Sequence, residues 1–402
     1  MHTKGIKNKK ECFEMSVIKE LSEKYESYAI DLRRELHAHP ELSLQEEWTS
    51  ARIVEELEKL GIPCEVVGPR NVVGLIDTGR AGRSIAIRAD IDALPLTEEV
   101  ELPFKSQFEG KMHACGHDAH AAMLVTISRI LNETKEQFSG KVYLCFQVAE
   151  ETGFGADDIV AYLQEKGGVD QVIATHIAGA APVGTIWIPD GPMYAGNMGF
   201  KIVVHGVGGH GSRPDAAVDP IRPACEILQA IAAIPVNRHD PFKTLVVSPC
   251  TIHAGTKNNI IPGEAEIEGN IRFFAYGDGD AAVEEIRRMS EHLAAAQGCT
   301  VEVTSEAMAP YPVINNNEAA ARGRALAAQQ GLTVLPPADP QAASDNYANF
   351  LNAFPGFYTM LGAHSEMPGT SGNHHNPTFC LNEDCIKLGI AFMAEYAFAF
   401  LK

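Results

Sequence analysis

The middle of the chain carries the pattern that most restricts the possible folds. There, strand-like and helical runs follow one another in the order β-α-β-β-α-β, with strands at 199–205, 245–254, 264–273 and 300–304, and helices at 219–234 and 280–296. This is the order of a split βαβ, or ferredoxin-like, unit. We therefore predict an inserted α+β domain over residues 198–305.

The segments on either side predict a single α/β domain that the insertion interrupts. Strands are expected at 63–67, 72–77, 84–90, 141–147, 171–176 and 356–361, and helices at 18–60 with a break near Pro40, 117–131, 155–165, 318–330 and 383–401. Strands that alternate with helices favour a sheet with helices packed on it. The two parts of this domain are predicted over residues 16–197 and 306–402.

Composition excludes several classes of partner. The 402 residues carry a formal net charge of −19, which repels phosphate backbones and anionic lipid, so we expect neither nucleic-acid nor membrane partners. No run approaches the roughly 18 apolar residues of a membrane span. The first fourteen residues lack the apolar run of a secretory signal; we predict a tail, with Met15 as an alternative start. Nine scattered cysteines indicate reduced thiols and a cytoplasmic location.

The densest group of reactive side chains is MHACGHDAH at residues 112–120. Cys115 and His117 are two residues apart, so their side chains converge on one point only from a loop or an extended segment. Thiolate, imidazole and carboxylate groups together suit zinc or another borderline divalent ion. A buried thiol beside a helix-capping histidine is the plainer interpretation, and the motif alone leaves it open.

Three further segments carry side chains that bind metals. Glu150 and Glu151 follow the strand at 141–147, where adjacent like charges are costly unless cations neutralise them; on an extended backbone the two would point apart. His176 ends the strand VIATHI, and sites usually form at the carboxyl ends of such strands. His374 and His375 share the loop NHHNPTF. Taken alone, the two glutamates could start a solvated helix, His176 could be a core or rim residue, and the paired histidines could lie on the surface. The joint presence of these segments indicates a metal site.

In this order the motifs resemble the aminoacylase/hippurate-hydrolase family of dinuclear metallo-amidohydrolases, which includes the indoleacetyl-amino-acid hydrolases. The similar segments are LHAHPELSLQE (36–46), RADIDALP (88–95), MHACGHDAH (112–120), AEETGFGAD (149–157), PVGTI (182–186), GGHGSRPDAAVDPI (208–221), NNIIPGEAEIEGNIR (258–272) and HHNPTF (374–379). The resemblance implies a zinc-peptidase-like α/β catalytic domain interrupted by a lid, in agreement with the insertion predicted above.

The resemblance also implies roles for the matching residues. Two divalent ions, zinc by expectation with manganese, cobalt or nickel as alternatives, are held by Cys115, His117, Glu151, His176 and His375, with Cys115 as the bridge. Glu150 is the general base that takes a proton from the attacking water and returns it to the leaving amine. The lid residue His210 is placed near the oxyanion, and Asn259 and Arg272 hold the substrate's free carboxylate.

Supporting roles are expected for three residues outside this set. Asp90 and Asp118 are expected to orient ligands, whereas His37, in the motif HAHP, is interpreted as structural. The loop at 364–377 is unusual for the family and leaves a choice between His374 and His375. We choose His375 because it directly precedes Asn-Pro.

Two further segments depart from the family pattern. Val148 stands where proline is usual, which is expected to shift the local backbone slightly. SDNYANF (344–350) replaces a typical Ser-Glu-Asp-Phe run. Because this run is expected near the pocket, the departure bears on substrate preference.

The predicted activity is metal-dependent hydrolysis of the amide bond of small N-acyl amino acids (N-acetyl, N-benzoyl or aryl-acetyl) to a carboxylate and a free amino acid. Alternatives are a metallo-carboxypeptidase or dipeptidase, a catalytically silent metal-binding relative, and a thiol enzyme that uses Cys115. Related peptidases generally have a carboxylate at the position of Cys115, so the cysteine favours the acyl-amino-acid branch. The family often dimerises through its lids, so a homodimer is expected. The acyl group, the amino acid and the native metal stay open.

Overall fold

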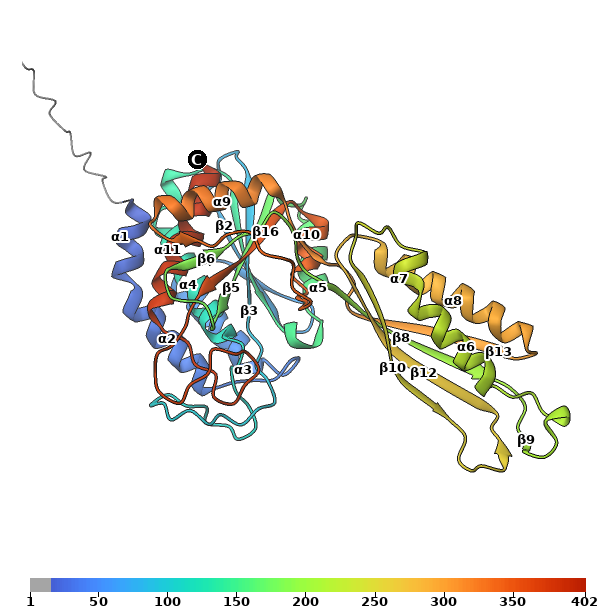
Figure 1. The fold of residues 1–402 in the computed structure, drawn as a ribbon. Coiled ribbons are helices and arrows are strands. Elements are labelled where there is room, and N and C mark those ends of the chain that lie inside the picture. Colours follow the sequence, from blue (N-terminus) through green and yellow to red (C-terminus); the bar gives the residue numbers. More distant parts are fainter. Residues whose placement is uncertain (1–15) are drawn as a thin grey trace, which may run out of the picture.

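The larger lobe of the molecule is an eight-stranded mixed sheet with helices on both faces (Figure 1). The computed structural model describes residues 16–402, so the tail predicted for residues 1–14 lies outside the described residues. The strand order is β1-β2-β4-β3-β5-β16-β6-β15. These strands are β1 (Cys64–Val67), β2 (Asn71–Asp77), β3 (Ser84–Asp90), β4 (Lys141–Gln147), β5 (Gln171–Ala178), β6 (Thr185–Trp187), β15 (Thr333–Val334) and β16 (Gly356–Gly362).

Four neighbouring strands at the centre of this sheet, β4, β3, β5 and β16, run parallel. They are buried along nearly their whole length, as expected of parallel strands that helices cover on both faces. Their carboxyl ends meet at one edge of the sheet, where α/β folds usually build their sites.

Helices divide between the two faces of the sheet. The apolar core on one face includes residues of α1 (Val17–Lys24), α2 (Glu26–Ala38), α3 (Glu47–Lys59), α4 (His117–Glu133), α9 (Asn317–Gln329) and α11 (Asp384–Leu401). The core on the other face includes residues of α5 (Ala156–Glu165) and α10 (Ala348–Ala353). The predicted break near Pro40 is confirmed, because α2 ends at Ala38.

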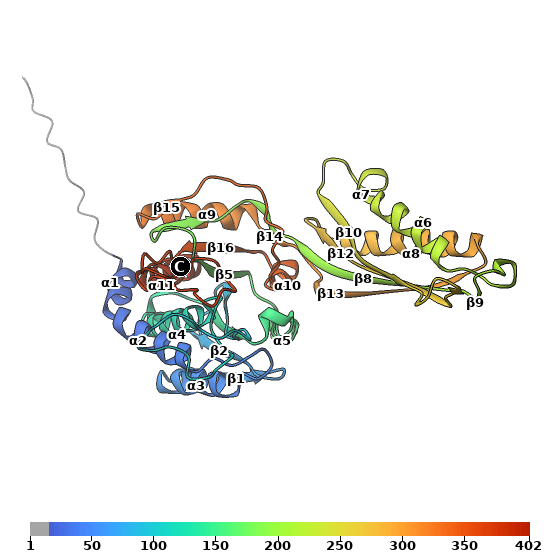
Figure 2. The ribbon, with the colours of Figure 1, turned by 60° about the horizontal axis from the view of Figure 1, so that its bottom comes forward.

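The smaller lobe is a four-stranded antiparallel sheet with two long helices on one face (Figure 2). Its elements are β8 (Gly196–His205), α6 (Ile221–Ala232), α7 (Ile234–Asn237), β10 (Leu245–Ala254), β12 (Glu264–Phe273), α8 (Asp278–Ala296) and β13 (Thr300–Ala309). The strand order β10-β12-β8-β13 places the first and third strands in the centre, so the predicted ferredoxin-like lid is confirmed.

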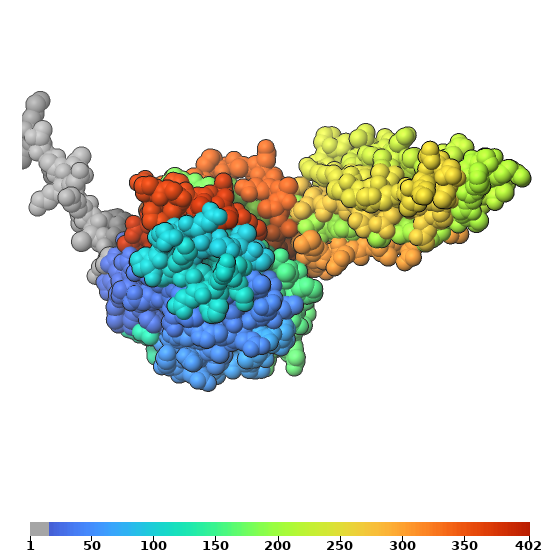
Figure 3. Space-filling model, turned by 90° about the horizontal axis from the view of Figure 1, so that it is seen from below, coloured from blue at the N-terminus to red at the C-terminus, as the bar shows by residue number. Residues whose placement is uncertain are grey.

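A narrow connection joins the two lobes (Figure 3). The chain enters the lid from β7 (Gly191–Tyr194) and returns through β14 (Val313–Asn315), which pairs with β7. The proposed domain boundaries at residues 198 and 305 fall inside β8 and β13, because both strands continue into this connection. Among residues 16–402, no helix is both long and apolar enough to cross a membrane.

Candidate active site

The turn after β4 carries Glu150 and Glu151. The expected extended backbone is wrong here: Ala149 has a left-handed φ of 57°, and Glu150–Thr152 forms a short 3-10 helix. An alanine in this region is strained, so neighbouring side chains must hold the turn. Buried side chains accept its backbone N–H groups: Asn71 Oδ1 from Val148 (2.9 Å), Glu46 Oε1 from Ala149 (2.8 Å) and Asp92 Oδ2 from Glu151 (3.0 Å).

His117 is the first residue of α4, directly after Gly116. The φ of Gly116 is 87°, and a Cβ there would meet the side chain of Ile177, so the approach requires glycine. The Nδ1–H of His117 donates to Asp92 Oδ1 over 3.1 Å. Within residues 16–402, its buried Nε2 has no hydrogen-bond partner. This is the arrangement of a metal-binding histidine that a carboxylate orients from behind.

His176 comes from the end of β5 and approaches Cys115. Its Nδ1–H donates to the carbonyl of Ile177 over 2.7 Å, which leaves Nε2 facing Cys115 Sγ at 3.3 Å. Burial lowers the pKa of His176 well below its usual range, with His120 and His374 adding to the effect. A neutral imidazole is the form that binds a metal.

The loop histidines His374 and His375 both reach this region, on different sides. His375 Nε2 lies 3.3 Å from Glu151 Oε1, and the bond to Glu151 raises the pKa of His375. His374 lies near Cys115 and His176, and its Nε2 accepts the N–H of Gly179 over 3.3 Å. Gly179 occupies one ring nitrogen of His374, but His374 Nδ1 is buried without a hydrogen-bond partner among residues 16–402. Both loop histidines therefore offer a ring nitrogen to an ion, and the choice of His375 stays a prediction.

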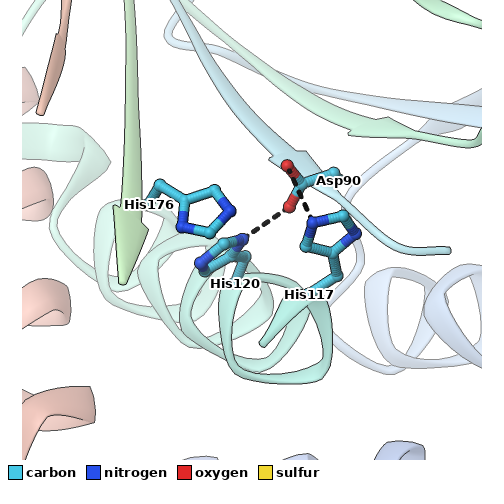
Figure 4. A group of neighbouring side chains, drawn as sticks. All are labelled: Asp90, His117, His120 and His176. Atoms are coloured by element: carbon cyan, nitrogen blue, oxygen red, sulfur yellow. Dashed lines mark hydrogen bonds and ion pairs between the residues drawn. The ribbon is translucent and has the colours of Figure 1, made fainter. Parts of the chain in front are cut away.

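A buried aspartate–histidine group lies beside these residues, and Figure 4 shows its four members: Asp90, His117, His120 and His176. His120 donates to Asp90 Oδ1 (2.5 Å) and accepts the N–H of Ile177 (3.0 Å). Both of its ring nitrogens are therefore occupied, and His120 acts as a brace between β3 and β5. His120 was not among the predicted site residues, although its i, i+3 spacing from His117 places both on one helix face.

The side chains fit a site for two divalent ions. Ligand atoms of three groups each lie within 4.8 Å of one another: Cys115, Glu151 and His375; Cys115, His176 and His374; and His117, Glu150 and Glu151. Two ligands of one tetrahedral zinc ion are about 3.3–3.8 Å apart, close to the 3.3 Å separations of Cys115 from His176 and of Glu151 from His375. The buried ring nitrogens His117 Nε2 and His374 Nδ1 lack hydrogen-bond partners among residues 16–402, as atoms facing an ion would.

Glu150 borders the same cavity and is surrounded by acidic groups. Burial raises its pKa well above its usual range, and Asp345 and Glu151 add to this. Asp345 is held in place by Arg88 (3.3 Å) and by the hydroxyl of Tyr358. Glu150 is therefore the carboxyl of this region that is best suited to exchange protons.

A cavity of about 870 Å³ opens beside Glu150, Glu151, Cys115 and His176, a volume typical of small-molecule sites. Its walls include many apolar residues, among them Trp187, Tyr194, Met308, Leu335, Pro336 and Met360. Arg272 of β12 reaches the cavity from the lid. Its Nε donates to Asn270 Oδ1 (2.9 Å), and in the described part of the chain no carboxylate forms an ion pair with it.

The structure does not bring His210 or Asn259 to this cavity. His210 lies in β9 (Gly209–His210), which pairs with β11 (Ile260–Ile261) at the end of the lid farthest from the large sheet (Figure 1). Asn259 is adjacent, since its carbonyl accepts the N–H of Gly211 over 2.9 Å. Both residues are exposed. Within one chain, they cannot contact a substrate that lies at Glu150.

His37 and Asp118 form a buried network behind α4. His37 Nδ1 lies 2.8 Å from Asp118 Oδ2, and its Nε2 lies 3.1 Å from Glu98. Arg33 donates to Asp118 Oδ2 over 2.7 Å. These contacts occupy both ring nitrogens of His37, in keeping with a structural role. Asp118 thus joins the start of α4 to Arg33 and His37 of α2. It does not contact the ring of His117.

Comparison with known proteins gives the family. The family model described as peptidase family M20/M25/M40 matches residues 86–399. The chain belongs to this family. Thermostable carboxypeptidase 2 of Saccharolobus solfataricus is 38% identical over 93% of this chain and 96% of that protein. N-acetylcysteine deacetylase of Bacillus subtilis is 35% identical over 92% of this chain and 95% of that protein.

A solved structure supports the same assignment. The YXEP protein of Bacillus subtilis, described as a dinuclear metal binding peptidase from the M20 family, superposes with a TM-score of 0.80. It is 32% identical, and the match covers 94% of this chain and 99% of that one. This chain is therefore an M20 metallo-hydrolase, and its relatives include both carboxypeptidases and deacetylases of N-acyl amino acids.

Proposed function

We propose that this M20 protein hydrolyses the amide bond of N-acyl amino acids to a carboxylate and a free amino acid. The observation that carries this proposal is Arg272, which faces a largely apolar cavity beside Glu150 without a carboxylate partner in the described residues. A guanidinium binds a carboxylate with two parallel hydrogen bonds. The free carboxylate of the substrate's amino acid is the group that Arg272 fits.

Cys115, His117, Glu151, His176 and His375 would hold two divalent ions, with zinc as the expected metal and manganese, cobalt or nickel as alternatives. When bound, such ions polarise the acyl oxygen and lower the pKa of water. Asp92 holds His117 in the required tautomer, and the Ile177 carbonyl does so for His176. Glu150 removes a proton from the attacking water and delivers it to the leaving nitrogen; its raised pKa favours this exchange near neutral pH.

A second candidate is carboxypeptidase activity, because the relative in Saccharolobus bears that name and Arg272 suits the C-terminal carboxylate of a peptide equally well. A peptide with a free amino terminus, however, brings an ammonium group to the acyl side. Asp345, the carboxylate of the cavity outside the ligand cluster, already pairs with Arg88 and Tyr358. A neutral acyl group therefore fits this cavity better than an aminoacyl group.

Two further alternatives fit the site less well. A thiol enzyme needs a cysteine with a lowered pKa, whereas burial raises the pKa of Cys115 well above its usual range. A silent relative is expected to have lost a ligand or the base, but here Glu150 and all five proposed ligands are present and grouped. Both observations favour a metal-dependent hydrolase.

We also propose that the protein works as a homodimer whose lids carry His210 and Asn259 to the partner's cavity. His210 Nδ1 accepts the N–H of Ser212 (3.1 Å) and contacts its hydroxyl (2.8 Å), so the proton is on the exposed Nε2. An outward Nε2–H is suited to donate to an oxyanion. In a dimer, the lid of one copy would bring this donor to the cavity of the other copy, because His210 does not reach the cavity of its own chain.

The activity is tested with N-acetyl, N-benzoyl and N-indoleacetyl amino acids, beside dipeptides with free amino termini. The enzyme is first treated with chelator and then given zinc, manganese or cobalt, with Glu150→Gln as the control variant. We expect amino-acid release that metal restores and Glu150→Gln reduces by several orders of magnitude. Release that persists after chelation contradicts the proposal, and turnover of dipeptides alone assigns the carboxypeptidase activity.

A further inference from the structure

A row of apolar side chains leads away from the metal-ligand cluster along the large sheet. His176 of β5 is in register with Met360 of β16, and Met360 is in register with Trp187 of β6. Residues in register point to the same face, and neighbouring strands lie about 4.8 Å apart, so this row spans roughly 10 Å. All three side chains line the cavity.

Two more residues extend the row beyond β6. The N–H of Leu335 donates to the carbonyl of Ile186 over 2.8 Å, which holds Leu335 and Pro336 beside β6; both line the cavity. We call Met360, Trp187, Leu335 and Pro336 the shelf. None of these side chains carries a charge, and the Tyr194 hydroxyl beside them is bonded to the Met360 thioether (3.1 Å). An apolar group that packs on the shelf is therefore stabilised, because both apolar surfaces are removed from water.

The position of Arg272 decides which half of the substrate reaches the shelf. Arg272 stands on β12 of the lid, whereas the shelf belongs to the large sheet. When the carboxylate of the leaving amino acid binds Arg272, that half of the substrate lies toward the lid. The acyl half then lies on the catalytic side of the scissile bond, next to His176 and Met360.

We propose that the shelf is an acyl-group subsite that selects bulky apolar acyl groups, aromatic ones above all, over acetyl. This inference rests on the proposed hydrolysis of N-acyl amino acids. An acetyl group ends one carbon beyond the scissile carbonyl and leaves Met360 and Trp187 uncovered. An aromatic acyl group covers them, and burial of one ring is expected to raise kcat/KM by about thirtyfold to one-hundredfold.

The test compares kcat/KM of the metal-loaded enzyme for N-acetyl-, N-benzoyl- and N-phenylacetyl-L-alanine. Wild type is compared with Met360→Ala and Leu335→Ala, which shorten the half-buried shelf at two points, and with Met308→Ala as the matched control. Met308 lines the same cavity, but it comes from lid strand β13 and is 53% exposed. Melting temperatures confirm that each variant is folded.

We expect wild type to prefer the aromatic substrates at least thirtyfold. Both shelf variants should reduce this preference about tenfold, and Met308→Ala should leave it within about twofold. Equal or better turnover of N-acetyl-alanine by wild type overturns the subsite and leaves the proposed function intact. An unchanged preference in both shelf variants, or an equal fall in Met308→Ala, also overturns it. Absence of alanine release from all three substrates overturns the proposed function, and this inference with it.

Discussion

At the scale of single residues, the position of the proposed base Glu150 depends on Glu46, about one hundred residues earlier in the chain. The Glu46 side chain is fully buried, and one oxygen holds the N–H of Ala149. The other oxygen has no partner among residues 16–402. Burial raises the pKa of Glu46 to about 7. Glu46 therefore stabilises the strained conformation of Ala149. Because its carboxyl group is buried, ionisation at higher pH costs desolvation free energy.

Glu46→Gln is expected to change how stability varies with pH. The folded pKa of about 7 lies above the ordinary 4.5, so the contribution of Glu46 is fully present below about pH 4.5 and is lost as pH rises through 7. Glutamine does not titrate. The melting temperature of Glu46→Gln minus that of wild type should therefore increase by a few degrees from pH 5 to pH 8. A difference that stays constant with pH would contradict the assignment.

Glu46→Ala is expected to impair catalysis by releasing Ala149 from its left-handed conformation. Because Glu46 positions Glu150 without touching the substrate, kcat should fall about tenfold to one-hundredfold while KM changes little. Glu58→Ala, an exposed change in α3, the helix that follows Glu46, is the control and should retain wild-type kinetics. Equal losses in both variants would show that the effect arises from the helix and not from the contact with Ala149.

From the sequence alone, candidate site residues could be identified where they lie in a dense motif or at the end of a strand. The sequence singled out Cys115, His117 and His176 because residues of these types at strand and helix ends are typical of metal ligands, and the structure brings them together. Glu46 and Asp92 were not singled out, because their roles consist of contacts with Ala149 and Glu151, about one hundred and about sixty residues later. A glutamate at the start of a helix is ordinarily solvated, and only the tertiary structure buries this one.

At the scale of elements, β10 is the part of the lid best suited to associate with a second copy. It is an edge strand of ten residues, and positions 250–254 are exposed on both faces. Its sequence LVVSPCTIHA contains no Asp, Glu, Lys or Arg, the charges that usually protect an edge. The opposite edge, β13, carries Glu302 and Glu306. Pro249 has no N–H to donate, so we expect pairing in the exposed half of β10 that contains Ile252.

Ile252→Lys is therefore expected to disrupt a dimer that forms through β10. Light scattering should show a dimer for wild type and a monomer for the variant, with the melting temperature nearly unchanged because Ile252 is 43% exposed. Glu302→Lys on the other edge is the matched control and should remain dimeric. A monomeric wild type, or a dimer that Ile252→Lys leaves intact, would remove β10 as the interface.

Long elements were predictable from sequence and short ones were not. The bounds 84–90, 141–147, 245–254 and 264–273 agree with the observed strands. Apolar runs, or in 264–273 apolar residues at alternate positions, make such strands evident. Two-residue strands such as β9 and β15 have no periodicity to detect. The turn at Glu150 was missed for a different reason: its left-handed alanine is imposed by Glu46 and Asp92, which no local pattern reveals.

At the scale of the whole molecule, the separation of the lid tip from the cavity is the feature that a single chain leaves unexplained. His210 and Asn259 lie at the far end of the lid, whereas Arg272 lies at its near end beside the cavity (Figure 1). Antiparallel pairing of two β10 strands reverses one lid relative to the other. In the proposed dimer, each tip would then point toward the partner's catalytic lobe, the closed, two-fold arrangement expected of a homodimer.

This arrangement predicts that two inactive variants restore each other. Each of the variants Glu150→Gln and His210→Ala should have little activity alone. In a mixed dimer, the cavity with an intact Glu150 receives an intact His210 from its partner, so one of the two sites is complete. Random assembly makes half of the dimers mixed, so co-expression should give about a quarter of wild-type kcat. The same pair carrying Ile252→Lys in both chains should give no recovery. If His210→Ala alone retains full activity, or if purified mixed dimers stay inactive, His210 does not act across the dimer.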